Sequence, residues 1–192
     1  MNKLFNPFEY YSEKTLIAFG IAVLSVASLA AWYFGGRYDG VVDFHLSKDI
    51  TIWQPFADNA IATFCLVVPL FILARSINNR TRPADITATA IIARTPFVIE
   101  PFFNAGGYFG EALERVKSIY MANGPSVLPG TSDVILISAF SLVSILLLVW
   151  FAILLYNGFK TATNVKKTSH IIMFVMAVIL AEILSAIIFY FI

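Results

Sequence analysis

The sequence predicts an all-α fold, a single membrane domain over residues 1–192 in which five helices cross the bilayer. Of the 192 residues, 59% are hydrophobic and only 13% are charged, whereas a soluble domain has about 25% charged residues. Five apolar runs are each long enough to cross about 30 Å of hydrocarbon as a helix. None of these runs alternates with the two-residue period of a half-buried strand. Together these observations predict a polytopic membrane helix bundle.

The first apolar run covers residues 15–35. It follows the segment FNPFEY, in which Asn6 can cap a helix, Pro7 suits the first helical position and Glu9 can reach back to the cap. We therefore expect a short aromatic helix on the inner interface that leads into the first span. A cleaved signal peptide is the weaker interpretation, because the run is long and acidic residues precede it. The second run covers residues 54–74.

The third run, residues 83–103, is the most polar of the five. The stretch IIARTPFVIEPFF within it contains Arg94, Glu100 and two prolines, Pro96 and Pro101. Each proline leaves a carbonyl of the preceding turn without its N–H partner. A membrane helix tolerates this where neighbouring groups or water satisfy that carbonyl. We therefore expect a kinked span whose outer half is the place for a cavity.

The distribution of lysine and arginine indicates that the third run crosses the membrane. With five spans, one side holds eight of these residues: Lys3, Lys14, Arg75, Arg80, Arg82, Lys160, Lys166 and Lys167. The other side holds four: Arg37, Lys48, Arg115 and Lys117. If the third run only dipped into the membrane and returned, the split would be seven against five. Because basic residues concentrate in cytoplasmic loops, the sequence predicts a cytoplasmic N-terminus and an external C-terminus.

The longest loop separates the third run from the fourth. Within it, residues 108–122 are predicted to form an amphipathic helix. Its apolar residues recur at helical spacing: Phe109, Leu113, Val116 and Tyr120. We expect this helix to lie on the outer membrane surface, and a lid or partner-binding element is the alternative. The fourth and fifth runs, residues 133–156 and 170–192, are strongly apolar spans.

Two opposite charges are predicted near the bilayer centre. Arg94 and Glu182 lie at nearly equal distances from the inner ends of the third and fifth spans. A lone charge at this depth costs at least about 2.5 kcal/mol. Beside Glu182, the small residues Ala177, Ala181 and Ser185 recur every four positions and allow another helix to approach closely. We expect Arg94 and Glu182 to meet as a helix-orienting ion pair, with an ion or proton step as the functional alternative.

Other chemistry is weakly indicated. Asp58, Glu100 and Asp133 lie near one outer level, where three carboxylates could hold a cation, although such residues more often face water at helix ends. The sequence has no metalloprotease histidine pair, phosphate loop or Ser-His-Asp set. We therefore expect no enzyme activity, no cofactor and no metal site. The net charge of +1 gives no indication of a nucleic-acid partner.

Four segments of the sequence together resemble a known membrane family. They are NPFEYYSEK before the first span, RTRPADITATAIIARTP through the third, YNGFKTATNVKK after the fourth and AEIL in the fifth. This combination resembles the Yip-one (Ypt-interacting protein) family, especially its short microbial membrane branch, and it covers nearly the whole chain. The resemblance implies five spans with a cytoplasmic N-terminus.

The same resemblance bears on function. In eukaryotic members the family implies roles in vesicle traffic, membrane shaping and the binding of small GTPases. Here only 14 residues precede the first span, which is shorter than the cytosolic arm associated with GTPase binding. We therefore expect a non-enzymatic scaffold or membrane-organising protein, located in the cytoplasmic membrane if the source is bacterial. Its expected partners are the lipid bilayer and a membrane protein or a second copy of the chain. The alternative is a small transporter or ion-conducting protein that uses Arg94 and Glu182.

Overall fold

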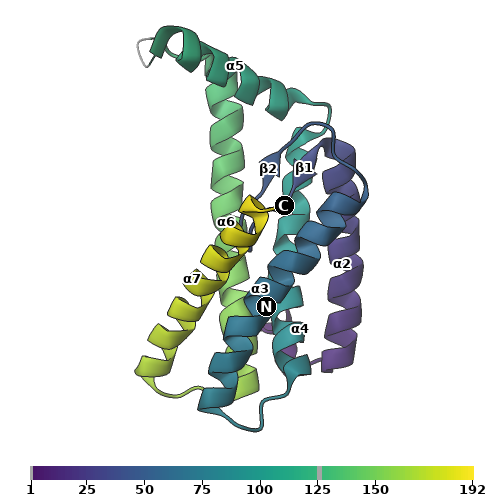
Figure 1. Ribbon diagram of the computed structural model, residues 1–192, viewed down its shortest axis with the longest axis vertical. Helices are drawn as coiled ribbons and strands as arrows, with labels where there is room; N and C mark the ends of the chain where they lie inside the picture. The colour runs from purple at the N-terminus through teal and green to yellow at the C-terminus, as the bar shows by residue number, and fades with distance from the viewer. Residues whose placement is uncertain (1, 125–126) are drawn as a thin grey trace.

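The computed structural model describes residues 2–124 and 127–192. Within these residues, five helices are long and apolar enough to cross a membrane, and they run alternately up and down through one bundle (Figure 1). This confirms the predicted all-α fold with five spans. The spans are α2 (Glu13–Phe34), α3 (Trp53–Ile77), α4 (Pro83–Arg94) continued by the 3₁₀ helix η2 (Thr95–Asn104), α6 (Thr131–Thr163) and α7 (Thr168–Tyr190).

The membrane orientation of the bundle stays a prediction. We call the end where α2 begins the inner end and the opposite end the outer end, following the distribution of basic residues. The inner end carries two short helices, α1 (Asn2–Phe5) and η1 (Pro7–Glu9). Asn6 is the N-cap residue of η1 and Pro7 is at its first position, as predicted, but the Asn6 side chain makes no capping hydrogen bond. At the start of α2, the Ser12 hydroxyl caps the helix by accepting the backbone N–H of Thr15 at 3.3 Å.

The third span changes helix type where the sequence predicts a kink. The α-helical part ends at Arg94, and the following ten residues, which include Pro96 and Pro101, form η2. A 3₁₀ helix of this length is uncommon, because its hydrogen-bond geometry is poorer than that of an α-helix. Two prolines five residues apart explain it, since each removes an N–H that an α-helix would use.

Both carbonyls released by these prolines receive a hydroxyl group. The carbonyl of Ile92, four residues before the first proline, accepts the Thr95 hydroxyl at 2.7 Å. The carbonyl of Phe97, four residues before the second, accepts the buried Tyr38 hydroxyl at 3.1 Å. The predicted requirement for neighbouring groups at the kink is therefore met by protein side chains.

Helix α6 is longer than its predicted span. Its 33 residues correspond to about 50 Å of helix, which exceeds the roughly 30 Å of the hydrocarbon core. Figure 1 shows α5 (Tyr108–Asn123) lying across the outer end of α6, with its first turn beside η2 and its last turns extending beyond the bundle. Arg115 of α5 holds the two helices together through two hydrogen bonds to the Asp133 carboxylate, at 2.8 and 3.1 Å.

The predicted apolar stripe of α5 is partly packed on the protein and partly exposed. Phe109 is buried and packs on Phe140 of α6, with ring centroids 4.5 Å apart. The next buried side chain is Ala112, whereas Leu113 and Tyr120 are exposed. The face of α5 that packs on the protein therefore includes Ala112 instead of Leu113. The larger side chains of Leu113 and Tyr120 stay exposed.

The outer loop between α2 and α3 enters the bundle. Its ends form a short antiparallel pair, β1 (Gly36–Arg37) with β2 (His45–Leu46). Between these strands, Tyr38 and Val41 are 2% and 1% exposed, which is unusual for a connecting segment because its backbone polar groups must find partners. Helix α7 packs mainly along α3, and its small-residue ridge of Ala177, Ala181 and Ser185 is buried.

Candidate functional site

The candidate site is a cluster of polar groups enclosed by the helices, which we call the polar centre. It consists of Arg94 at the end of α4, Asn59 on α3, Glu182 on α7 and the backbone of Gly40 and Val41 in the outer loop. Arg94 and Asn59 are buried and Glu182 is half-buried. Buried polar groups are costly unless they are hydrogen-bonded, so these side chains need partners within the protein.

Arg94 is the most deeply buried charged residue of the cluster, with 1% of its surface exposed. Its Nη1 atom donates to the carbonyls of Gly40, at 3.2 Å, and Val41. Its Nη2 atom donates to the Asn59 amide oxygen at 2.9 Å. The Nε atom is buried and has no partner among the described residues. The guanidinium thus binds three neutral acceptors and joins α4 to both α3 and the outer loop.

Glu182 binds the same loop from the other side. Its Oε2 atom accepts the backbone N–H of Val41 at 3.0 Å, and the Ser185 hydroxyl lies 3.3 Å from the same N–H. The loop approaches so closely that a Cβ atom on Gly40 would lie 3.0 Å from the Glu182 Oε1 atom and 2.8 Å from the Asp43 Cβ atom. A side chain larger than hydrogen therefore does not fit at Gly40 without a shift of its neighbours.

The predicted direct ion pair between Arg94 and Glu182 is absent from the described residues, where neither residue takes part in a salt bridge. The matching depth was a sound inference, since both residues reach the same dipeptide, Gly40-Val41. The reason for the error is that the outer loop inserts its backbone between the two side chains. In addition, α7 packs mainly along α3, whereas the prediction placed it against the third span.

The polar centre continues toward α2 through residues that the sequence analysis did not single out. The Asn59 amide donates to the Ser28 hydroxyl at 3.0 Å, and the single O–H of this hydroxyl has two acceptors within reach, the carbonyls of Leu24 and Pro55, at 2.9 and 3.1 Å. An amide inside an apolar run is itself a sequence signal, because an unpaired amide in lipid is costly. Asn59 could have been found in this way. The Gly40-Val41 backbone could not, because no polar side chain identifies it in the sequence.

The other predicted site residues are not brought together. Pro96, Glu100 and Pro101 are buried on η2, and no basic side chain forms a salt bridge with Glu100 in the part of the chain that the structure describes. Asp58 is bound by Arg37 through two hydrogen bonds, at 2.8 and 3.0 Å, which raise the pKa of that guanidinium.

The third carboxylate of the proposed cation set is also occupied, since Asp133 binds Arg115 at the outer end of α6. Residues 2–124 and 127–192 contain no group of three or more histidine, cysteine, aspartate or glutamate side chains placed to hold a metal ion. Asp58, Glu100 and Asp133 therefore do not form one cation site in this structure. Asp58 instead binds Arg37 of the outer loop, and Asp133 binds Arg115 of α5.

Comparisons of the chain with models of protein families, with curated proteins and with solved structures give no match. The resemblance to the Yip-one family therefore rests on the sequence segments alone and stays a prediction.

The geometry of the polar centre indicates what it can do. Its donors and acceptors connect α2, α3, α4, α7 and the outer loop through hydrogen bonds to fixed partners. Removing Arg94 or Asn59 leaves buried partner groups unpaired, and each unpaired group costs about 1–3 kcal/mol. The arrangement is thus suited to lock five segments in one relative position.

Proposed function

We propose that this multi-pass membrane protein is a non-enzymatic scaffold or membrane-organising factor that acts through helix and lipid contacts. One observation carries the proposal: the charges at the centre of the bundle are engaged in holding the chain together. Arg94 is 1% exposed and bound by the loop and by Asn59. A conducting pathway needs ionisable groups that reach a water-filled cavity, and Arg94 is enclosed by protein.

The outward surfaces of the protein support a role in lipid contact. Helices α6 and α7 expose long rows of apolar side chains, among them Leu142, Leu146, Met176 and Ile183. Such surfaces match hydrocarbon, and they also allow contact with another membrane protein or a second copy of the chain. The family resemblance agrees with this role, because it implies membrane shaping by members of the family.

Helix α5 is the element we expect to act on the bilayer surface. It lies across the outer end of α6 (Figure 1) and leaves Leu113 and Tyr120 exposed, at 36% and 50%. Apolar side chains on an interfacial helix insert into the headgroup region and alter lipid packing. This would give the outer leaflet a contact that the spans alone do not provide.

The test is reconstitution into liposomes at increasing protein-to-lipid ratios. Vesicle diameters are measured by electron cryomicroscopy, and proton and potassium fluxes are measured with trapped dyes. We expect the diameter distribution to shift with the ratio, while fluxes equal those of protein-free vesicles. A variant with Leu113→Glu and Tyr120→Glu should weaken the shift, because both acidic side chains resist insertion. Glu114→Gln on the same helix is the matched control and should retain it.

Two results would overturn the proposal. Unchanged vesicle diameters at every ratio would remove the membrane-organising role. A flux above that of protein-free vesicles that disappears in Glu182→Gln would replace it with the ion-conducting alternative, because this variant keeps the size of the side chain and removes its charge.

A further inference from the structure

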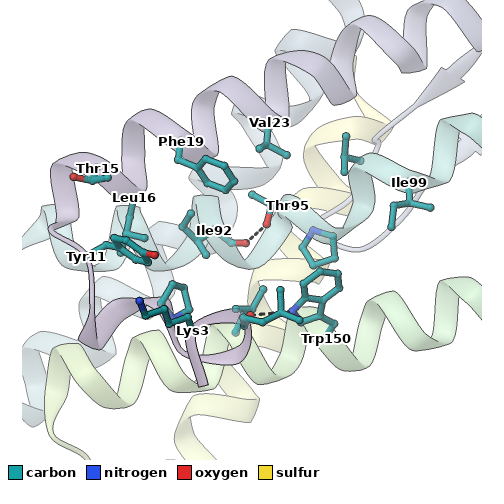
Figure 2. Close-up of a pocket in the computed structure, with 15 residues that line it drawn as sticks. Lys3, Tyr11, Thr15, Leu16, Phe19, Val23, Ile92, Thr95, Ile99 and Trp150 are labelled. Carbon is teal, nitrogen blue, oxygen red and sulfur yellow. Dashed lines mark hydrogen bonds between the residues drawn. The ribbon is translucent and has the colours of Figure 1, made fainter. Parts of the chain in front are cut away.

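A groove opens on the side of the bundle between α2, η2, α6 and the N-terminal segment. It has a volume of about 610 Å³, within the range of roughly 300–1,000 Å³ typical of sites for small organic ligands. In Figure 2, Lys3 and Tyr11 lie at one end of this groove, Phe19 and Ile92 lie in the middle, and Ile99 lies at the other end. We call it the α2–η2 groove.

The walls of the groove are apolar along its length. Phe19, Val23, Ile99 and Trp150 are among the lining side chains. Phe19 and Ile99 are 58% and 41% exposed, so the groove is open toward the membrane. The hydroxyl of Thr95, which also lines it, already donates to the carbonyl of Ile92. A ligand in this groove therefore meets hydrocarbon surface for most of its length.

The inner end of the groove carries a positive charge. Lys3 lines it, and no acidic side chain does so among the described residues of the lining. The Lys3 ammonium lies over the Tyr10 ring, 5.6 Å from its centroid. Trp150 of α6 donates to the carbonyl of Leu4 at 3.4 Å, and this bond holds the N-terminal segment in place as a wall.

Charge and depth together select the occupant. The Lys3 end is the predicted cytoplasmic end of the bundle, and anionic phospholipids give the cytoplasmic leaflet its negative surface. We propose that the α2–η2 groove binds one acyl chain of an anionic phospholipid, with the lipid phosphate at Lys3. This proposal rests on the proposed function in lipid contact and names the site and the lipid class.

Tryptophan fluorescence gives a direct test, because Trp150 lines the groove and the chain has only three tryptophans. Trp32→Phe with Trp53→Phe leaves Trp150 as the single reporter. This protein is reconstituted in phosphatidylcholine vesicles with small mole fractions of lipid carrying bromine, a quencher, on the acyl chain. We expect brominated phosphatidylglycerol to reach half-maximal quenching at a mole fraction about fivefold lower than brominated phosphatidylcholine, the factor expected for one basic residue at an anionic surface.

Matched variants separate the groove from general charge and general lipid contact. Lys3→Ala should remove the fivefold preference, whereas Lys14→Ala should retain it, because Lys14 is exposed and does not line the groove. Val23→Phe narrows the groove and should also reduce the preference. Val26→Phe, on an exposed part of the same helix, should not. Lys3 is exposed, so loss of folding does not complicate its substitution.

Three results would overturn the proposal. The first is equal quenching by the two lipids, and the second is a lipid preference that survives Lys3→Ala. The third is equally strong competition by soluble glycerol phosphate, because it would mean that the groove does not bind the acyl chain. The assay also separates this inference from the proposed function. Changed vesicle diameters without a lipid preference leave the function standing and the groove refuted. An ion flux together with a lipid preference would refute the proposed function and leave the groove proposal standing.

Discussion

Replacing Arg94 by leucine should destabilise the protein by roughly 3–5 kcal/mol, because it removes the hydrogen bonds of its guanidinium that fasten the outer loop to α4. The guanidinium binds the carbonyls of Gly40 and Val41 and the amide oxygen of Asn59. Each hydrogen bond to a charged group contributes about 1.5–3 kcal/mol, and the acceptors left behind are buried. Part of this loss is offset, since the variant no longer buries a charge.

The double variant decides how the polar centre works. Glu182→Leu removes the carboxylate that accepts the Val41 N–H. Combined with Arg94→Leu, it leaves the Gly40-Val41 dipeptide without either of its charged partners. We expect the loss of stability in the double variant to be smaller than the sum of the two single losses by less than about 1 kcal/mol. The reason is that neither substitution supplies the partners that the other removes.

The measurement is the free energy of unfolding in mixed micelles of a mild detergent and dodecyl sulfate. Arg75→Leu is the matched control: Arg75 is exposed near the end of α3 and bonds the backbone of Asn79, so its loss should stay within about 0.5 kcal/mol. A double variant nearly as stable as the natural sequence would refute the reasoning, since it would mean that the two charges compensate each other directly. A loss below about 1 kcal/mol for Arg94→Leu would also refute it.

Four further outcomes can be checked. Gly40→Ala should lower the free energy of unfolding by about 1–3 kcal/mol through overpacking against Glu182. Gly130→Ala should cause no such loss, because a Cβ atom there would meet only ordinary contacts. Equal losses in the two variants would contradict the close approach of the loop to Glu182. Tyr38→Phe should cost about 1–2 kcal/mol in the same assay, because it leaves the Phe97 carbonyl without its hydroxyl donor, and an unchanged stability would argue that another group replaces it. Arg115→Ala should increase the mobility of a spin label at Lys117, because α5 loses its bonds to Asp133. Glu114→Ala, which removes only an exposed contact with Lys48, is the control. Equal mobility in the two variants would mean that Phe109 alone holds α5. A reporter fused after Ile192 should read as external and one near Lys166 as cytoplasmic, and the same compartment for both would rule out a fifth crossing.

The five spans and the break in the third could be predicted from composition and pattern. In hydrocarbon every backbone polar group must be paired within the protein, so long apolar runs have few alternatives to the helix. The prolines likewise act on the backbone of their own turn, and the change from α4 to η2 occurs beside Pro96. The small-residue ridge of α7 was also visible in the sequence, because side-chain size at spacing four is a local property.

The partners of Arg94 could not be predicted in the same way. Depth along a helix follows from counting residues, and it correctly placed Arg94 and Glu182 near each other. Which groups fill the space between them depends on the path of the outer loop, and that path is set by packing. The acceptors at Gly40 and Val41 are backbone carbonyls, which every residue possesses, so no residue type marks them.

The same division holds for the α2–η2 groove and for α5. Amphipathic spacing located α5 to within a residue, but which of its apolar side chains contact the protein is set by Phe140 and Asp133 on another helix. The groove joins residues from six helical elements between Lys3 and Trp150, and a surface of this kind exists only once those elements pack. Hydrophobicity and backbone pairing act along the chain and can be read from it, whereas enclosure and shape arise between segments that are distant in sequence.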